Sequence, residues 1–89
     1  MDPEKAARRM REIIKALRAA EKIKEWPPGY ADELRELRDE GWDIIDDLGA
    51  WVRRGGFAPR GYRQLWPDFY SALDNIGVSY GGIGFYRSR

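Results

Sequence analysis

The stretch Glu25-Trp26-Pro27-Pro28-Gly29-Tyr30 decides the first half of the fold, because it separates two long amphipathic segments. Proline lacks a backbone N–H and its ring clashes with the preceding helical turn, so two prolines followed by glycine end a helix. The sequence therefore predicts one helix before this stretch and another after it, and the two can pack as a hairpin across the turn.

The segment before the turn, residues 1–26, is predicted to be a basic amphipathic helix. Asp2 is a favourable N-cap, and Pro3 suits the first helical position. Apolar side chains recur at helical spacing along one stripe: Ala6, Ala7, Met10, Ile13, Ile14, Leu17 and Ala20. Basic side chains form a second stripe nearly opposite: Arg8, Arg11, Lys15, Arg18 and Lys22. This basic stripe either follows a phosphate backbone or is simply the solvated face of the helix.

The segment after the turn, residues 29–56, is predicted to be an acidic amphipathic helix that Gly55 and Gly56 end. Its apolar face contains Tyr30, Leu34, Leu37, Ile44, Ile45, Leu48 and Val52. Gly41 lies on that face, where it either admits a close neighbour or breaks the helix. The opposite face contains Asp32, Glu36, Asp39, Glu40, Asp43 and Asp47. That acidic face either mimics a nucleic acid, binds a basic partner, collects a divalent metal ion or only keeps the surface solvated.

Residues 57–89 are predicted to contain two short helices and a β-hairpin. Pro59 can open a helix to about Leu65, and Pro67 can open another that ends at Ile76. The stretch Val78-Ser79-Tyr80-Gly81-Gly82-Ile83-Gly84-Phe85 is typical of a hairpin with a two-residue Gly-Gly turn. The predicted fold class is therefore α+β, mostly α, with two long helices, two short helices and a C-terminal β-hairpin in one domain spanning residues 1–89.

The order of these elements from Asp43 to Arg87 resembles a winged helix. The stretches carrying the resemblance are Ala50 to Pro59, Phe69 to Gly77 and Gly82 to Tyr86. They are similar in rhythm to the winged-helix domains that close phage and plasmid primase-helicases. The resemblance implies a DNA-binding domain in which Pro67 to Ile76 is the recognition helix and the Gly81-Gly82 turn is the tip of the wing.

The charges around this implied wing are the candidate nucleic-acid-binding residues. The recognition helix itself carries Asp68 and Asp74 and no Lys or Arg, although phosphate contacts usually supply most of the affinity. Basic side chains surround it instead: Arg53, Arg54, Arg60, Arg63, Arg87 and Arg89. We expect these six arginines to contact phosphates. The basic stripe of residues 8–22 is expected to add further contacts along the phosphate backbone.

Composition limits the other functional classes. The 89 residues include 16 basic and 15 acidic side chains, and neither Cys nor His. Disulfides, thiolate chemistry and the commonest general base and metal ligand are therefore excluded. No catalytic residue, metal site or cofactor is predicted. Since no apolar run approaches about 20 residues and no signal peptide opens the chain, we expect a cytoplasmic protein without a membrane partner.

The sequence thus predicts a non-enzymatic binding module, and two functions stay open. The first is nucleic-acid binding through the arginines. The alternative is a small protein–protein interaction module, an inhibitor or adaptor, using the side chains of Trp42, Asp39, Asp43 and Asp46. Residues 2–25 also have the composition and capping of a designed helix, so the chain is either a natural phage or bacterial protein or a partly designed one. The sequence does not fix the oligomeric state.

Overall fold

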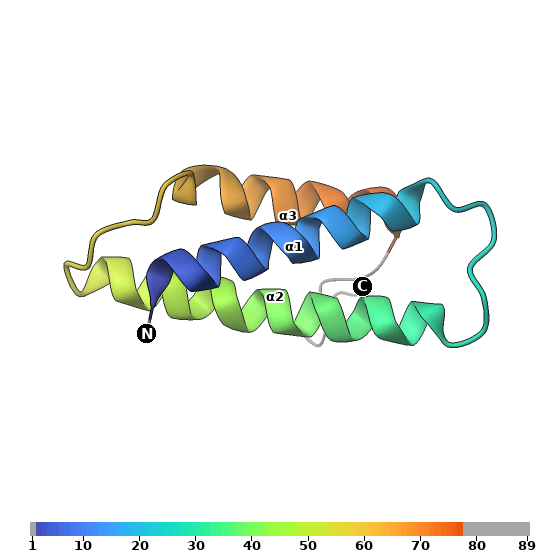
Figure 1. Cartoon of the computed structure of the whole chain (residues 1–89), viewed down its shortest axis with the longest axis horizontal. Coiled ribbons are helices and arrows are strands. Elements are labelled where there is room, and N and C mark those ends of the chain that lie inside the picture. Colours follow the sequence, from blue (N-terminus) through green and yellow to red (C-terminus); the bar gives the residue numbers. More distant parts are fainter. Residues whose placement is uncertain (1, 78–89) are drawn as a thin grey trace, which may run out of the picture.

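The computed structural model describes residues 2–77, which form three α-helices. They are α1 (Pro3–Glu21), α2 (Tyr30–Arg53) and α3 (Tyr62–Ile76). The helices lie side by side, with residues 22–29 joining α1 to α2 at one end and residues 54–61 joining α2 to α3 at the other (Figure 1). α1 and α3 therefore run in the same direction. α1 packs extensively on both other helices, whereas α2 and α3 touch each other less.

The predicted α+β fold class is wrong, because residues 2–77 are all-helical and contain no strand. The expected hairpin at residues 78–85, which made the class α+β, lies outside the described residues. The two expected short helices, Pro59 to Leu65 and Pro67 to Ile76, are also not separate. One continuous helix, α3, begins at Tyr62 and runs through both to Ile76, and Pro59 precedes it.

Tertiary packing explains why α3 continues through Pro67. A proline inside a helix removes one backbone hydrogen bond, which normally favours a break at that point. Leu65, Phe69 and Leu73 lie on both sides of the proline, are spaced four residues apart and are all buried. A continuous helix keeps these three side chains on one face against the core, and this packing outweighs the lost hydrogen bond.

Side chains fix both ends of α1. The Asp2 carboxylate accepts hydrogen bonds from the backbone N–H groups of Glu4 and Lys5 at 3.1 and 3.2 Å. At the other end the helix stops before the two prolines, and the indole N–H of Trp26 donates to the Ala20 carbonyl at 3.1 Å. The Ala20 carbonyl also accepts from the Ile23 backbone N–H at 3.1 Å, so Trp26 adds a second donor that ties the connection to the end of α1.

Gly41 is a position where a side chain of α3 lies directly against the backbone of α2. A Cβ atom at Gly41 would lie 2.6 Å from two ring carbons of Phe69, and the Phe69 side chain is fully buried. Of the two alternatives that the sequence left open, the glycine admits a neighbour and does not break the helix, because α2 continues to Arg53.

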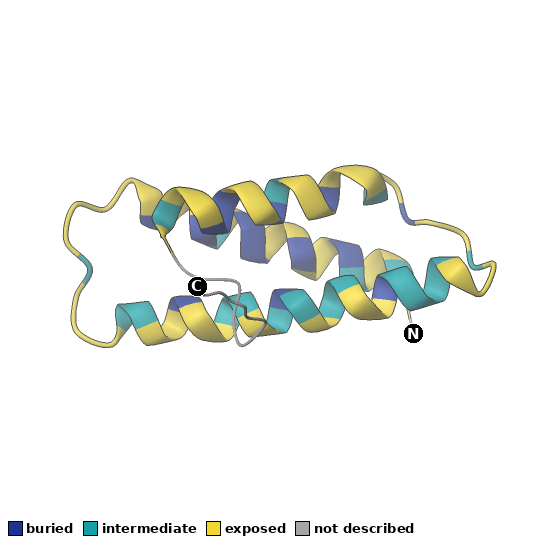
Figure 2. Cartoon of the chain, turned by 180° about the vertical axis from the view of Figure 1, so that it is seen from behind, coloured by how far each residue is buried: buried dark blue, intermediate teal, exposed yellow. Residues whose placement is uncertain are grey.

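The core lies where the three helices face one another, and the outer sides are exposed (Figure 2). Its buried members are Ala7, Met10, Ile13, Ile14, Leu17, Ala20, Leu34, Leu48, Leu65, Phe69, Ala72 and Leu73. Half of them come from the predicted apolar stripe of α1, which confirms that stripe. Burying each of the larger side chains stabilises the fold by about 1.5–3 kcal/mol. With its apolar stripe inside, α1 keeps its basic stripe on the surface.

Candidate functional site

A groove of about 640 Å³ runs between α1 and α3. One wall is a series of basic side chains on α1, here named the cationic row: Arg11, Lys15, Arg18 and Lys22. The opposite wall carries Gln64 and Asp68 from α3, and the buried side chains of Ile14 and Leu65 also line the groove. The groove therefore combines a strongly basic wall with an apolar base, which is a suitable environment for an anion.

The walls of this groove follow from helical spacing. The members of the cationic row recur every three or four residues, which places them on one side of α1. The buried residues at positions 10, 13, 14 and 17 hold the other side of α1 against the core. On α3, Gln64 and Asp68 are four residues apart and share a face, because the helix continues through Pro67.

The cationic row is only partly neutralised. Arg18 Nη2 lies 3.5 Å from Asp68 Oδ1, and both side chains are largely or partly exposed, so this contact is weak. Lys15 and Lys22 form no ion pair with any residue in the range 2–77. The groove thus holds four cations against one carboxylate.

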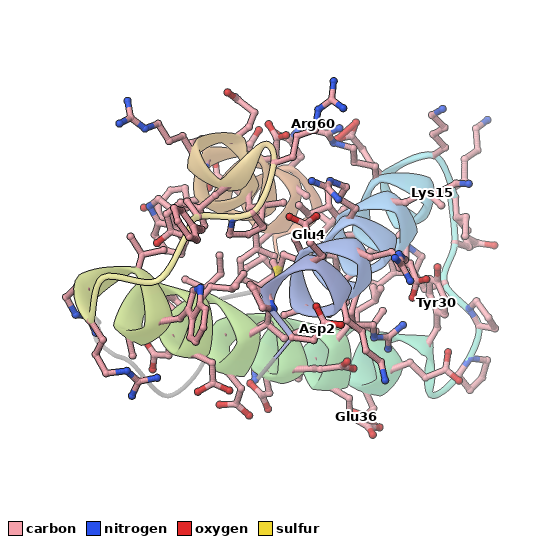
Figure 3. All side chains as sticks on the ribbon, turned by 60° about the vertical axis from the view of Figure 1, so that its left-hand side comes forward. Asp2, Glu4, Lys15, Tyr30, Glu36 and Arg60 are labelled. Atoms are coloured by element: carbon pink, nitrogen blue, oxygen red, sulfur yellow. The ribbon has the colours of Figure 1, made fainter. Side chains whose placement is uncertain are left out.

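The loop between α2 and α3 is attached to α1 at one end of the groove. The Arg11 guanidinium donates a hydrogen bond to the Arg60 carbonyl, and the Arg60 backbone N–H donates to Glu4 Oε2 at 3.3 Å. Figure 3 shows Arg60 and Lys15 on the side of the bundle formed by α1 and α3, and Glu36 on the far side of α2. Lys15 of the cationic row and Glu36 of α2 therefore lie on different sides of the bundle.

A bidentate ion pair joins α1 to α2 away from the groove. Arg9 Nε and Nη2 donate to the two carboxylate oxygens of Glu40 at 2.6 and 2.8 Å. These hydrogen bonds lower the pKa of Glu40 and raise the pKa of Arg9. Arg9 is therefore engaged within the fold and does not contribute to the cationic row.

Four of the six predicted nucleic-acid-binding arginines lie at the end of the bundle where α2 leads into α3. They are Arg53, Arg54, Arg60 and Arg63. Arg53 and Arg63 line a separate hollow of about 340 Å³ between α2 and α3, together with Trp66. None of these four side chains lines the α1–α3 groove. Arg87 and Arg89 lie outside the described residues.

Trp42, the predicted interaction anchor, is half-buried because α3 covers it. Its ring centroid lies 5.1 Å from that of Trp66 and 6.3 Å from that of Phe69. Trp66 in turn lies 5.3 Å from Tyr70. The exposed rings of this aromatic cluster are on α3, where Trp66 and Tyr70 keep 38% and 44% of their surface accessible.

The three predicted acidic interaction residues are exposed along α2 but do not form one site. Asp39 pairs with its neighbour Arg38 at 2.9 Å. Asp46 lines the hollow between α2 and α3, while Asp43 lines neither that hollow nor the groove. Across residues 2–77, no three His, Cys, Asp or Glu side chains converge in a way that could hold a metal ion.

Sequence reasoning missed the α3 wall of the groove. Gln64 and Asp68 give a signal only when Pro67 is placed inside a helix, because two separate helices would not align them. In the described part of the chain, no helix has the length and apolar character needed to cross a bilayer. No protein-family model, curated protein or solved structure matches the chain at a significant level. The resemblance to winged-helix domains stays a prediction.

Proposed function

We propose that the protein is a non-enzymatic binding module that holds the phosphate backbone of a nucleic acid in the α1–α3 groove. The observation that carries this proposal is the cationic row, which faces the single carboxylate of Asp68 across the groove. Lysine and arginine side chains make most of the phosphate contacts that give nucleic-acid-binding proteins their affinity.

The dimensions of the cationic row support this proposal. From Arg11 to Lys22 the helix rises about 17 Å, which matches the axial rise of about five nucleotides of one strand. Neighbouring cations are about 5–6 Å apart along α1, so several can contact phosphates at once. Gln64 on the opposite wall adds an exposed amide that can donate to a phosphate oxygen.

The charge distribution also determines which side of the bundle a nucleic acid approaches. α2 carries eight acidic and three basic side chains, so it repels a polyanion. The α1–α3 side carries the cationic row. A nucleic acid is therefore attracted to one side of the bundle and kept from the other, although the whole chain has a net charge of only +1.

Salt dependence of binding tests the proposal. Fluorescence anisotropy with a labelled mixed-sequence duplex is measured between 50 and 200 mM salt. Four phosphate contacts predict a slope of about −3.6 in log K against log salt, or about 150-fold weaker binding at the higher salt. The variant Lys15→Gln/Lys22→Gln removes two contacts and should halve the slope.

The matched control is Lys5→Gln/Lys24→Gln, which removes the same charge from positions outside the groove. We expect this control to keep most of the wild-type slope of log K against log salt. An equal reduction of the salt slope in both double variants would mean that net charge alone attracts the ligand. It would contradict a binding site in the groove. Absence of measurable wild-type affinity at 50 mM salt for both this duplex and a single strand of the same sequence would contradict nucleic-acid binding altogether.

A second candidate is a protein-interaction module, favoured by the exposed aromatic side chains on the α2–α3 side. Trp66 shares its hollow with Asp46, so the surface offers both an aromatic anchor and a carboxylate. Aromatic side chains of this kind often dominate binding energy at protein interfaces. A wild-type protein without affinity for nucleic acid at low salt would favour this second candidate.

A further inference from the structure

Phe57 is the most exposed large apolar side chain in residues 2–77, with 91% of its surface accessible to solvent. It lies in the loop between α2 and α3. Single exposed apolar residues are common on protein surfaces and do not by themselves indicate a binding site. What distinguishes Phe57 is that its loop is fixed by specific contacts and contains only basic charges.

The loop is held in place by Trp51. The indole N–H of Trp51 donates to the Phe57 carbonyl at 3.0 Å, and the Gly56 N–H donates to the Trp51 carbonyl at 3.0 Å. The backbone at Gly56 lies directly on the indole, since a Cβ there would be 2.3 Å from the ring. Gly55 has φ of 92°, a conformation that favours glycine. The loop therefore fixes the Phe57 backbone while its ring stays in solvent.

The same loop leads into the cationic groove. Gly61 lines the groove and follows Phe57 by four residues, which is at most about 14 Å of chain. Arg60 is bonded through its carbonyl to Arg11, a member of the cationic row. Residues 54–61 contain Arg54 and Arg60 and no acidic side chain. An exposed aromatic ring thus follows α2 in a loop whose other end, four residues away, lines the cationic groove.

We infer that Phe57 stacks on an unpaired base of the nucleic acid in the groove, so that the preferred ligand has a single-stranded segment. This inference rests on the proposed function. Proteins that bind single strands combine a basic groove with aromatic rings that stack on bases. Among residues 2–77 no aromatic side chain lines the α1–α3 groove itself, whereas Phe57 belongs to the loop that leads into it and is fully available for stacking.

The experiment compares a labelled 12-nucleotide single strand with the 12-base-pair duplex of the same sequence, by anisotropy at 50 mM salt. The variants are Phe57→Ala, Phe57→Leu and Phe57→Tyr, with Ile23→Ala as a second exposed apolar position in the other connection. Loss of one stacked base should weaken single-strand binding by about 5- to 140-fold. We expect Phe57→Ala and Phe57→Leu to lose this factor, and Phe57→Tyr and Ile23→Ala to stay within about twofold of wild type.

Duplex binding should change less than about twofold in all four variants, because the paired bases are not available for stacking. Urea midpoints equal to wild type will establish that the variants are folded. Equal loss of affinity for the single strand and the duplex in Phe57→Ala would overturn the inference. So would a Phe57→Leu protein that binds the single strand as tightly as Phe57→Tyr. If the wild type binds duplex with the expected salt slope and Phe57→Ala binds the single strand normally, only this inference fails. If the wild type binds neither ligand, the proposed function fails as well.

Discussion

Replacing Gly41 with alanine tests the contact between α2 and the Phe69 side chain of α3. Alanine in a helix interior is about 1 kcal/mol more favourable than glycine, so an unobstructed Gly41→Ala would stabilise the protein. The added Cβ would, however, lie 2.6 Å from two ring carbons of the buried Phe69 and 3.3 Å from Met10 Cε. Overpacking of this kind costs about 1–3 kcal/mol. We therefore expect Gly41→Ala to range from neutral to about 2 kcal/mol less stable than wild type.

Gly49→Ala is the matched control in the same helix. The nearest atom to a Cβ there is Arg53 Nη1 at 3.2 Å, the far end of a flexible side chain that can move away. The helix-propensity gain is the same at both glycines, so the difference between the two variants isolates the contact with Phe69. We expect Gly49→Ala to be about 0.5–1 kcal/mol more stable than wild type.

Urea unfolding followed by circular dichroism at 222 nm measures both variants. The predicted result is a higher midpoint for Gly49→Ala and an unchanged or lower midpoint for Gly41→Ala. A Gly41→Ala protein as stable as Gly49→Ala would refute the reasoning, because it would mean that Phe69 does not lie against α2 at this position.

Three further substitutions test other parts of the fold by the same unfolding assay. Pro67→Ala should stabilise by about 1–3 kcal/mol if α3 is continuous, since the alanine N–H can donate to the Arg63 carbonyl; a neutral or destabilising result would indicate that Pro67 begins a separate helix. Asp2→Ala should destabilise by about 1 kcal/mol through loss of the N-cap, and an unchanged midpoint would contradict that role. The Arg9 guanidinium lowers the pKa of Glu40, so the pair stabilises the fold fully above the ordinary carboxyl pKa of about 4.3 and loses this effect as the pH falls through the lowered value. Glu40→Gln should therefore reduce the fall in stability between pH 7 and pH 3, by less than about 1 kcal/mol because the pair is exposed; identical pH profiles would count against the ion pair.

The first two helices could be predicted from the sequence because their signals are local. The N-cap at Asp2, the helical spacing of apolar residues and the two prolines before Gly29 depend only on neighbouring residues. The sequence predicts a helix as far as residue 26, whereas α1 ends at Glu21. Ile23 and Trp26 lie off the apolar stripe, and the Trp26 side chain instead turns back to hydrogen-bond with Ala20.

The third helix could not be predicted because its continuity depends on tertiary packing. Pro67 is a local signal for a helix start, and only the burial of Leu65 together with Phe69 reveals that the two halves form one face. The groove depends on this same continuity. The basic stripe of α1 was visible in the sequence, but nothing local indicated that Gln64 would lie opposite to it.

The structural basis of Phe57 exposure was equally invisible in the sequence. The sequence around a phenylalanine in a glycine-rich loop does not indicate whether its side chain is buried in the core or exposed to solvent. Its exposure depends on Trp51, which binds the Phe57 carbonyl and packs on Gly56. These contacts arise only after the chain has turned at the end of α2.

The most direct test of the central claim, that the cationic row binds phosphate, is a two-dimensional ¹H–¹⁵N NMR titration with a short nucleic acid at low salt. We expect the largest shift changes on residues 11–22 of α1 and on the backbone and side-chain amides of Gln64, with α2 residues 32–47 unaffected. Largest changes on α2, or on the hollow around Trp66, with the α1–α3 groove unperturbed, would contradict it.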